Sequence, residues 1–376
     1  MKLAALAASL CCTLAQGSFL DRFKDPEDGA FDASEYLLDH RGALPVPIVI
    51  TEPAVGYGGG LALAWFSESI RDAAQKAAGG RVIPPDIYGG MVAGTENGTK
   101  AGGAAARLTF DHGRWLYRGG AAAMSVNLDF YGVGGVLGSP AIDKVGYNLK
   151  GAVLFQEINH RMGASNHFLG ARLLYMDIKT RLDASNEDAS LSSRELAKRT
   201  SQLGARWSYD SRDNIFSSRH GTDAAVDLMF ADPALGSDNT FQTYRAHAFH
   251  YMQPTERSVF AMRLDARAAR GEVPFYQLPF IDMRGIPAAR YQDENTGIVE
   301  AELRYYATSR WIVVGFMGAA RAWGRKTSFE ETGTRVSKGA GFRYVLARRI
   351  GLAIGIDVAR GPEETAWYLQ VGNAWK

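Results

Sequence analysis

Hydrophobic and polar side chains alternate with period two along most of this chain. Between Ser258 and Arg270, for example, Met262 and Leu264 fall on one parity and Arg263 falls on the other. Because successive side chains of a strand point to opposite faces, such a segment has one apolar and one charged face. The alternation recurs in segments of about ten residues broken by turn residues, which is typical of a transmembrane β-barrel with apolar side chains toward lipid.

A soluble two-sheet sandwich could show the same alternation with its apolar parity inward. Repetition along the whole chain, an N-terminal export signal and the lack of cysteine after that signal favour the barrel. The pattern therefore predicts an all-β fold, a transmembrane antiparallel β-barrel of about sixteen strands. The expected strands cover residues 44–51, 56–67, 86–96, 101–111, 114–128, 145–157, 165–177, 200–211, 220–231, 239–252, 256–270, 296–307, 310–323, 336–346, 350–360 and 366–375.

An even number of strands returns both ends to the periplasm, so short turns and long loops are expected to alternate. The short turns are expected at 254–255, 309–310 and 348–349, and the long loops at 178–199, 271–295 and 324–335. The segment 68–85 does not fit, because it is a helix-like insertion on the short-turn side. Either it is a periplasmic helix or the first two expected strands are wrong.

The N-terminus has the pattern of an export signal. Lys2 precedes an apolar stretch over residues 3–14 and a small-residue neighbourhood, which predicts a signal peptide over residues 1–17. A lipoprotein anchor at Cys11 or Cys12 is the competing interpretation. Both cysteines of the chain lie in this leader, so the mature chain is expected to contain no disulfide and no cysteine metal site.

The remaining chain divides into a short acidic segment and the barrel. Residues 18–43 are polar and acidic with little periodicity, and are expected to form a short periplasmic N-terminal segment. Residues 44–376 are expected to form the outer-membrane β-barrel. The 42 Lys and Arg against 40 Asp and Glu favour no particular partner, and no apolar run reaches the roughly 18 residues of a membrane helix.

Charged side chains of both signs fall on the polar parity of the clearest strands. Arg263, Asp265 and Arg267 share this parity on one segment, and Glu300 and Glu302 share it on the next. Because a buried charge is costly unless it is paired, mixed signs on neighbouring strands favour cross-strand ion pairs inside the barrel. The alternative is a charged constriction that selects ions, which would favour one sign in one belt.

Three segments are more specific than a generic barrel. The first is a strand followed by a turn whose Asp and Asn side chains can cap the backbone. The second lies in a long loop, and the third is an alternating C-terminal strand with aromatic and aliphatic side chains on the lipid parity. Their residues are Tyr209, Asp210, Arg212, Asp213 and Asn214 for the strand–turn motif, Arg284 and Gly285 for the loop motif, and Trp367, Leu369, Val371 and Trp375 for the closing strand.

In this order and spacing, the three segments resemble the bacterial surface antigen family, the barrels of BamA- and TamA-type outer-membrane assembly and translocation proteins. The resemblance covers about residues 44–375 and is strongest in the second half. It implies a sixteen-stranded barrel with a long loop folded into the lumen, Arg284 against acidic or aromatic groups of the wall, and a weak seam between the first and last strands. The closing strand resembles the insertion signal that the barrel assembly machinery recognises.

The chain departs from the family pattern in two places. Members that fold or export other proteins carry periplasmic POTRA domains before the barrel, and the N-terminal segment here has room for none. Members also tend to carry an Asp, as partner of the loop arginine, where this chain has Gly318. If Arg284 folds inward, Glu300 or Glu302 is its expected partner, with Asp210 next. An exposed loop with a solvated arginine is the alternative.

The leading functional interpretation is a barrel without POTRA domains in the outer membrane of a Gram-negative bacterium, where it assists insertion or translocation of proteins or lipids. The expected partners are outer-membrane lipids and lipopolysaccharide, the barrel assembly machinery during biogenesis, and a periplasmic helper or client protein, but no nucleic acid. The alternative is a passive channel or porin. No cofactor, metal or catalytic residue is expected, because the seven histidines lie in no nucleophile or metal-binding motif.

Overall fold

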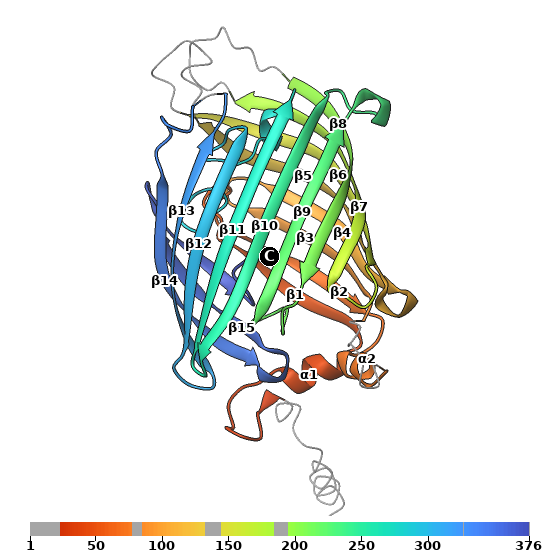
Figure 1. The fold of residues 1–376 in the computed structure, drawn as a ribbon, viewed down its shortest axis with the longest axis vertical. Coiled ribbons are helices and arrows are strands. Elements are labelled where there is room, and N and C mark those ends of the chain that lie inside the picture. Colours follow the sequence, from red (N-terminus) through yellow and green to blue (C-terminus); the bar gives the residue numbers. More distant parts are fainter. Residues whose placement is uncertain (1–22, 77–84, 132–143, 184–194, 326, 376) are drawn as a thin grey trace, which may run out of the picture.

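The protein is described here by a computed structural model covering residues 23–76, 85–131, 144–183, 195–325 and 327–375. These residues form one sheet of sixteen antiparallel strands, each paired with its neighbours along the chain, and the sheet curves into a barrel (Figure 1). The strands are β1 (Gly42–Ile50), β2 (Gly58–Phe66), β3 (Ile87–Thr95), β4 (Lys100–Phe110), β5 (Trp115–Tyr131), β6 (Lys144–Arg161), β7 (His167–Asp183), β8 (Glu195–Asp210), β9 (Gly221–Ala231), β10 (Phe241–Thr255), β11 (Ser258–Gly271), β12 (Asn295–Tyr306), β13 (Trp311–Trp323), β14 (Arg335–Ala347), β15 (Leu352–Arg360) and β16 (Thr365–Val371). The helices are α1 (Ser34–Asp39) and α2 (Ile70–Lys76), with short 3-10 helices η2 (Asp111–Gly113), η3 (Pro233–Leu235), η4 (Phe275–Gln277) and η5 (Arg348–Ile350).

The prediction of an all-β barrel with sixteen strands is confirmed, although several strand ends differ. β7 and β8 extend into the stretch that was expected to be a long loop. The closing strand was expected over 366–375, and its C-terminal part is wrong because β16 ends at Val371. Gly372, at φ +75°, turns the backbone out of the strand there.

The insertion over 68–85 is resolved in favour of a helix, since β1 and β2 are both present and α2 lies between β2 and β3. α2 packs beside α1 at the end of the barrel that carries the short turns (Figure 1). Arg71 of α2 pairs with Glu35 of α1 at 2.6 Å and with Asp39 at 2.5 Å. No helix in the described part of the chain is both long enough and apolar enough to cross a bilayer.

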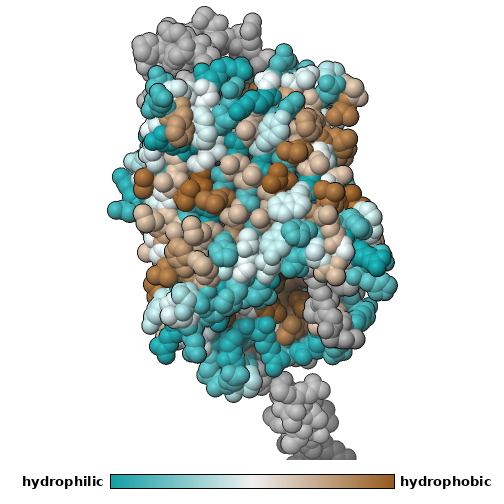
Figure 2. Space-filling view, in the orientation of Figure 1, coloured by the Kyte–Doolittle hydropathy of each residue, from teal (hydrophilic) through white to brown (hydrophobic). Residues whose placement is uncertain are grey.

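The strand register assigns one face of each strand to the lumen, because directly paired residues of antiparallel strands share a face. Glu157, Arg118, Arg107 and Ile87 are successive partners across β6, β5, β4 and β3, and Glu157 belongs to a buried network of ion pairs inside the barrel. The opposite parity faces outward and carries exposed apolar side chains such as Leu264. Figure 2 shows most hydrophobic side chains across the middle of the visible face and hydrophilic ones at both ends.

Ion pairs between lumen-facing side chains link neighbouring strands of the wall. Arg172 on β7 reaches Glu157 on β6 at 2.7 Å and Asp227 on β9 at 2.6 Å, and Arg206 on β8 reaches Asp227 at 2.8 Å. Because each carboxylate is shared by more than one guanidinium, no charge of this network is left without an opposite charge. The expected cross-strand ion pairs are confirmed. A second network centres on the buried carboxylate of Asp265 and includes Arg245, Arg263 and Arg267.

An N-terminal strap, residues 23–41, lies across the short-turn end of the barrel. Arg310, in the turn between β12 and β13, binds three of its carboxylates, those of Asp25 at 2.6 Å, Asp28 at 2.7 Å and Asp32 at 2.6 Å. The predicted signal peptide lies outside the described residues. Because α1 at the other end of the strap packs on α2, the strap ties the C-terminal strands to the N-terminal ones.

Two carboxylates of the strap have lowered pKa values. The hydrogen bond from Arg310 lowers the pKa of Asp28 from 3.8 to about 2. At Asp32, burial acts against ionisation, but hydrogen bonds from Ser34 and Arg310 outweigh it and lower the pKa. A carboxylate with a lowered pKa stabilises the docked state above its free pKa, and the stabilisation is lost as the pH falls to the docked pKa.

The first prediction concerns this docking. The strap should stay docked at neutral pH and detach as the pH falls from about 4 to about 2. Replacement of Arg310 by Gln should release it at neutral pH, because three carboxylates lose their partner, and trypsin should then cleave after Arg41 about tenfold faster. Arg257→Gln, in an adjacent short turn, is the control and should not change the cleavage rate. Equal rates for both variants would contradict the role given to Arg310.

Candidate functional site: the lumenal loop and the seam

The connection between β11 and β12, residues 272–294, folds back into the lumen. Its buried side chains Ile281 and Met283 pack on the lumen-facing side chains of Ile298 on β12 and Ala320 on β13. Gly318 on β13 leaves room for Met283 in this contact. The apolar side of the loop is therefore covered by the barrel wall, which holds the loop inside.

The beginning of the same loop contacts the opposite wall. Phe275 meets the ring of Tyr147 on β6 edge-on, with centroids 5.2 Å apart. Gln277 exchanges hydrogen bonds of 2.9 Å with Gln202 and Thr200 on β8. The loop thus spans the lumen from β6 and β8 to β12 and β13.

Arg284 is the charged anchor of the loop. Its Nη1 lies 2.8 Å from a carboxylate oxygen of Glu302 on β12 and 2.7 Å from one of Asp357 on β15. The guanidinium stacks over the ring of Phe316 on β13, with its carbon 3.6 Å from the ring centroid. The side chain is only 8% exposed, and two carboxylates and one aromatic face compensate its desolvation.

The backbone beside Arg284 is held to the wall as well. Gly285 has φ +85°, and its N–H donates to the hydroxyl of Tyr368 on β16 at 2.9 Å. The hydroxyl of Ser337 on β14 donates to the carbonyl of Arg284. A Cβ on Gly361 would lie 1.8 Å from the carbonyl oxygen of Gly285. Only glycine fits at position 361, directly after β15. The hydrogen bonds of Ser337 and Tyr368 connect the loop to β14 and β16.

Of the three carboxylates considered for Arg284 from the sequence, the structure brings Glu302 to it. Glu300 instead binds Arg263 at 2.8 Å, and Asp210 binds Arg212 at 2.9 Å. The second partner, Asp357, was missed by the sequence analysis. The sequence feature that could have identified Asp357 is an acidic residue on the lumen-facing parity of β15.

Gly318 stands on β13 directly opposite Glu300. A Cβ there would lie 2.5 Å from the sulfur of Met283 in the loop and 2.6 Å from the Cγ of Glu300. The position where family members tend to carry an acidic partner therefore provides space for the loop in this chain. The partner of Arg284 comes from β15 instead.

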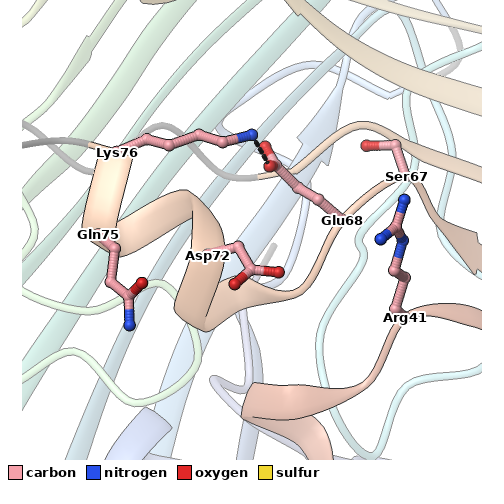
Figure 3. A pocket seen from close by; sticks show the side chains of 6 residues that line it. All are labelled: Arg41, Ser67, Glu68, Asp72, Gln75 and Lys76. Carbon is pink, nitrogen blue, oxygen red and sulfur yellow. Dashed lines mark hydrogen bonds and ion pairs between the residues drawn. The ribbon is translucent and has the colours of Figure 1, made fainter.

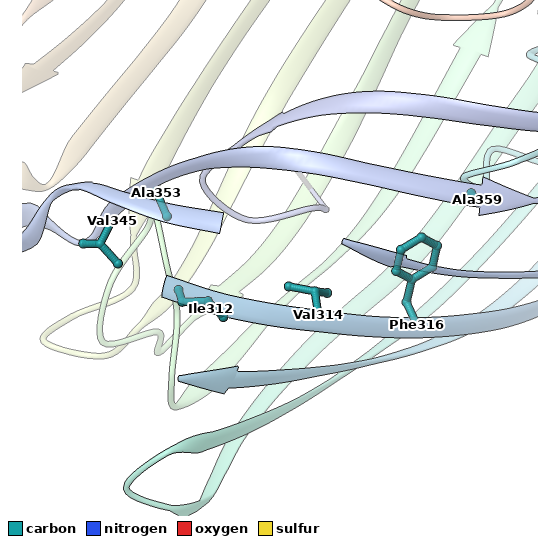
Figure 4. Close-up of a cluster of buried hydrophobic side chains, with 6 residues drawn as sticks. All are labelled: Ile312, Val314, Phe316, Val345, Ala353 and Ala359. Carbon is teal, nitrogen blue, oxygen red and sulfur yellow. The ribbon is translucent and has the colours of Figure 1, made fainter. Parts of the chain in front are cut away.

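A cluster of buried apolar side chains fills the lumenal side of β13, β14 and β15 (Figure 4). Phe316 belongs to it and carries the guanidinium on its face. Tyr368, the acceptor for Gly285, packs against the same cluster. The C-terminal half of the lumen is thus packed. The cluster consists of Ile312, Val314, Phe316, Val345, Ala353 and Ala359.

The strand–turn motif after β8 fixes its own turn and holds the turn between β14 and β15. Arg212 bridges Asp210 and Asp223, at 2.9 and 2.7 Å. The carboxylate of Asp213 accepts the backbone N–H groups of residues 219 and 220, and the amide of Asn214 donates to the carbonyl of residue 350 at 2.9 Å. Tyr209 contacts the ring of His167 on β7. The motif is therefore a scaffold at the short-turn end.

The C-terminal motif divides into two parts. Trp367, Leu369 and Val371 lie on the outward parity of β16, as expected, with Trp367 and Val371 exposed. Trp375 was expected on the same lipid-facing strand, and this is wrong: it is 4% exposed and packs on Phe249 and Tyr251 in the lumen. The parity of the strand does not extend to it because the backbone turns after Val371.

β1 and β16 form a seam without strand pairing. They are the two ends of the sheet order, and no ladder joins them in the described part of the chain. A side-chain contact crosses the seam: the indole N–H of Trp367 donates to the hydroxyl of Tyr57 at 3.2 Å, and the two rings stack with centroids 5.7 Å apart. The seam is held by side chains at this point, and not by a backbone ladder.

A pocket of about 650 Å³ lies at the short-turn end beneath β1 and β2 (Figure 3). Its charges balance, with Arg41 and Lys76 against Glu68 and Asp72, and Lys76 binds Glu68 across it. Balanced, solvated charges of this kind indicate a rim rather than a site with convergent chemistry. The strongest candidate site is therefore the Arg284 loop together with the seam.

Comparison with known proteins agrees with this architecture. Residues 120–282 match the sequence model of the Omp85 superfamily domain. The structure is similar to BamA from Haemophilus ducreyi lacking POTRA domains 1–3, with a TM-score of 0.59 and 12% identity over 89% of this chain and 70% of that one. The resemblance inferred from the sequence motifs is confirmed by these matches.

Two structures of CdiB are also similar. The match to CdiB from Acinetobacter baumannii has a TM-score of 0.57 and 11% identity over 88% of this chain, and the match to CdiB from Escherichia coli has a TM-score of 0.57 and 12% identity over 87%. This chain spans 59% and 62% of those proteins. No curated protein sequence matches the chain. At these identities the likeness concerns the fold.

The second prediction tests the anchor of the loop. Arg284→Met should lower the free energy of unfolding by about 3 kcal/mol, the lower end for breaking a buried ion pair, because Arg304 and Arg343 still face Glu302 and Asp357. The measurement is unfolding by denaturant in detergent, in which heat-modifiable gel mobility reports the folded fraction. Arg325→Met removes an exposed pair with Glu294 and should cost less than about 1 kcal/mol. Equal losses would contradict the anchor.

Proposed function

We propose that this barrel, with its match to the Omp85 superfamily domain, spans the outer membrane of a Gram-negative bacterium and moves substrates into or across that membrane through its seam. The BamA and CdiB folds support the proposal at the level of architecture. Biogenesis by the barrel assembly machinery, contact with outer-membrane lipids and lipopolysaccharide, and a periplasmic helper or client protein belong to the same proposal.

The unpaired seam is the observation that carries this proposal. Within lipid, backbone N–H and C=O groups need partners inside the protein, and a closed ladder is the usual solution for a barrel. Here fifteen ladders are continuous, from β1–β2 to β15–β16, and the sixteenth is missing from the described strands. A site without this ladder opens sideways at low energetic cost, because few hydrogen bonds have to be broken.

The Arg284 loop favours a transfer function rather than a wide passive channel. It crosses the lumen and is bound to both sides of the wall. Through Gly285 and Tyr368 it also connects to β16, one side of the seam. The loop can therefore brace the last strand while the first strand moves.

The third prediction is the test of this function. Cysteines replacing Tyr57 and Trp367 are joined by a reducible bismaleimide, which locks the seam. The chain is placed in lipid vesicles, and two rates are measured: folding of an unfolded eight-stranded outer-membrane barrel into the vesicle, and transfer of a fluorescent phosphatidylglycerol across it. The lock should slow at least one rate about tenfold, and reduction should restore it.

The control is a cysteine pair replacing Leu264 and Val299, which are outward-facing partners on β11 and β12. Their ladder is closed already, so the same crosslink should leave both rates unchanged. If the seam lock also changes neither rate, and the chain conducts steadily in a planar bilayer, the barrel is a passive channel and the proposal is wrong.

A further inference from the structure

The edge of β1 that faces the seam has few backbone donors. In an antiparallel strand, residues of one parity turn their N–H and C=O groups toward one neighbour, and residues of the other parity turn them toward the opposite edge. β1 pairs with β2 without a register shift, although Pro45 and Pro47 share one parity. Because proline has no N–H, this parity must be the one that faces the seam.

Two donors therefore remain on that edge, those of Ala43 and Val49. They stand six residues apart, which is about 20 Å in a strand. An incoming polypeptide strand would find no donor along the middle of β1, so it could not build a continuous ladder there. Proline on an edge strand is a known protection against strand addition. The seam of this barrel is thus poorly suited to a strand as cargo.

The lumenal wall next to the seam is apolar. The register places Leu44, Val46 and Ile48 of β1, Ala64 of β2 and Met91 of β3 on the lumen face. No lumen-facing position on β1, β2 or β3 carries a charge, in contrast to the ion-pair networks on β6 to β12.

These apolar side chains are also accessible to solvent. Val46 is 40% exposed and Met91 is 42% exposed, and the other lumen-facing residues of β1 to β3 are partly exposed. By contrast, the apolar side chains on the lumenal side of β12 to β15 are buried, against the loop or against one another. An apolar surface of this kind inside a barrel is expected to hold an apolar ligand rather than water.

A cation stands at the lower border of this wall. Arg107 on β4 faces the lumen at the level of Gly42 and Phe66, through the register of β1 to β4. Its cross-strand partner is another cation, Arg118, which is bound to Glu157. In the described residues, the Nη1 of Arg107 is buried without a hydrogen-bond partner. Asp86 is the carboxylate whose charge acts on it, and it already accepts a backbone N–H.

We propose that the lumenal face of β1 to β3 holds the acyl chains of an anionic phospholipid that enters through the seam, with its phosphate at Arg107. An apolar wall ending at a cation matches the two parts of such a lipid, and the charge of Arg107 complements the phosphate. The inference rests on the proposed function and specifies its cargo, since the seam connects this wall to the bilayer and its β1 edge disfavours a strand.

The fourth prediction is the test of this site, with the full chain in vesicles that contain phosphatidylglycerol carrying a photoactivatable diazirine in one acyl chain. After illumination, residues that carry lipid adducts are identified by mass spectrometry. Lumen-facing Val46 and Met91 should be labelled, whereas annular lipid reaches only outward positions such as Val92. The same probe as a diacylglycerol, which lacks the phosphate, should label the lumen positions about tenfold less, the loss expected for one charge-assisted contact.

Two variants and one control sharpen the result. Arg107→Gln should lower lumenal labelling about tenfold, and Met91→Gln, at an accessible position where the fold tolerates a polar side chain, should lower it severalfold. Arg114→Gln changes an exposed arginine in the nearby turn and should have no effect. Labelling confined to outward residues, or lumenal labelling that ignores the headgroup and Arg107, would overturn the proposal.

The result is independent of the seam-lock experiment. A seam lock that stops barrel folding but not lipid transfer, together with an unlabelled lumen, would leave the proposed function standing and remove the lipid. A labelled lumen with both rates unaffected by the lock would keep the lipid site and remove transfer through the seam.

Discussion

The constraint on which this structure depends is the pairing of backbone groups in a sheet that crosses lipid. Each internal strand satisfies its N–H and C=O groups with two neighbours, and the continuous order from β1 to β16 does this at all positions but one. Pro45 and Pro47 prevent β1 from offering a full set of donors to β16. The seam is therefore built into the covalent structure of β1, and the remaining contact is made by Tyr57 and Trp367.

Because the barrel has no ladder at the seam, the strands on the C-terminal side of the seam have to be held by other contacts. The Arg284 loop provides such contacts: it joins β12, β13 and β15 by one guanidinium and reaches β16 through Gly285. The strap bound by Arg310 adds a second connection outside the lumen, from the turns of the C-terminal strands to α2. The wall thus differs around the barrel: the lumenal side of β6 to β15 is charged or packed, and that of β1 to β3 is apolar.

Much of this architecture follows from local rules of sequence. The alternation at Arg263, Met262 and Leu264 fixes the faces of β11, and the same rule places Glu302 inside, where it meets Arg284. What the alternation cannot supply is the identity of distant partners. Asp357 lies on another hairpin, and its approach to Arg284 depends on the path of the whole loop.

Two further features escaped the sequence for different reasons. The acidic residues bound by Arg310 have no periodicity, and their partner is some 280 residues away in sequence, so nothing local connects them. The prediction that Trp375 faces lipid was wrong because the alternation of the strand ends where Gly372 turns the backbone. The prolines of β1 were visible within the expected strand 44–51, but their meaning depends on which edge pairs with β2.

The most direct measurement of the central claim is hydrogen exchange at the seam after Pro45 and Pro47 are both replaced by valine. The substitution returns two donors to the free edge of β1, and valine suits a strand. If the prolines keep the seam open, amide protection on β16 should rise about tenfold or more as a β1–β16 ladder forms, and lipid transfer should slow with it. Unchanged exchange on β16 would contradict the account, because the seam would then be open for another reason.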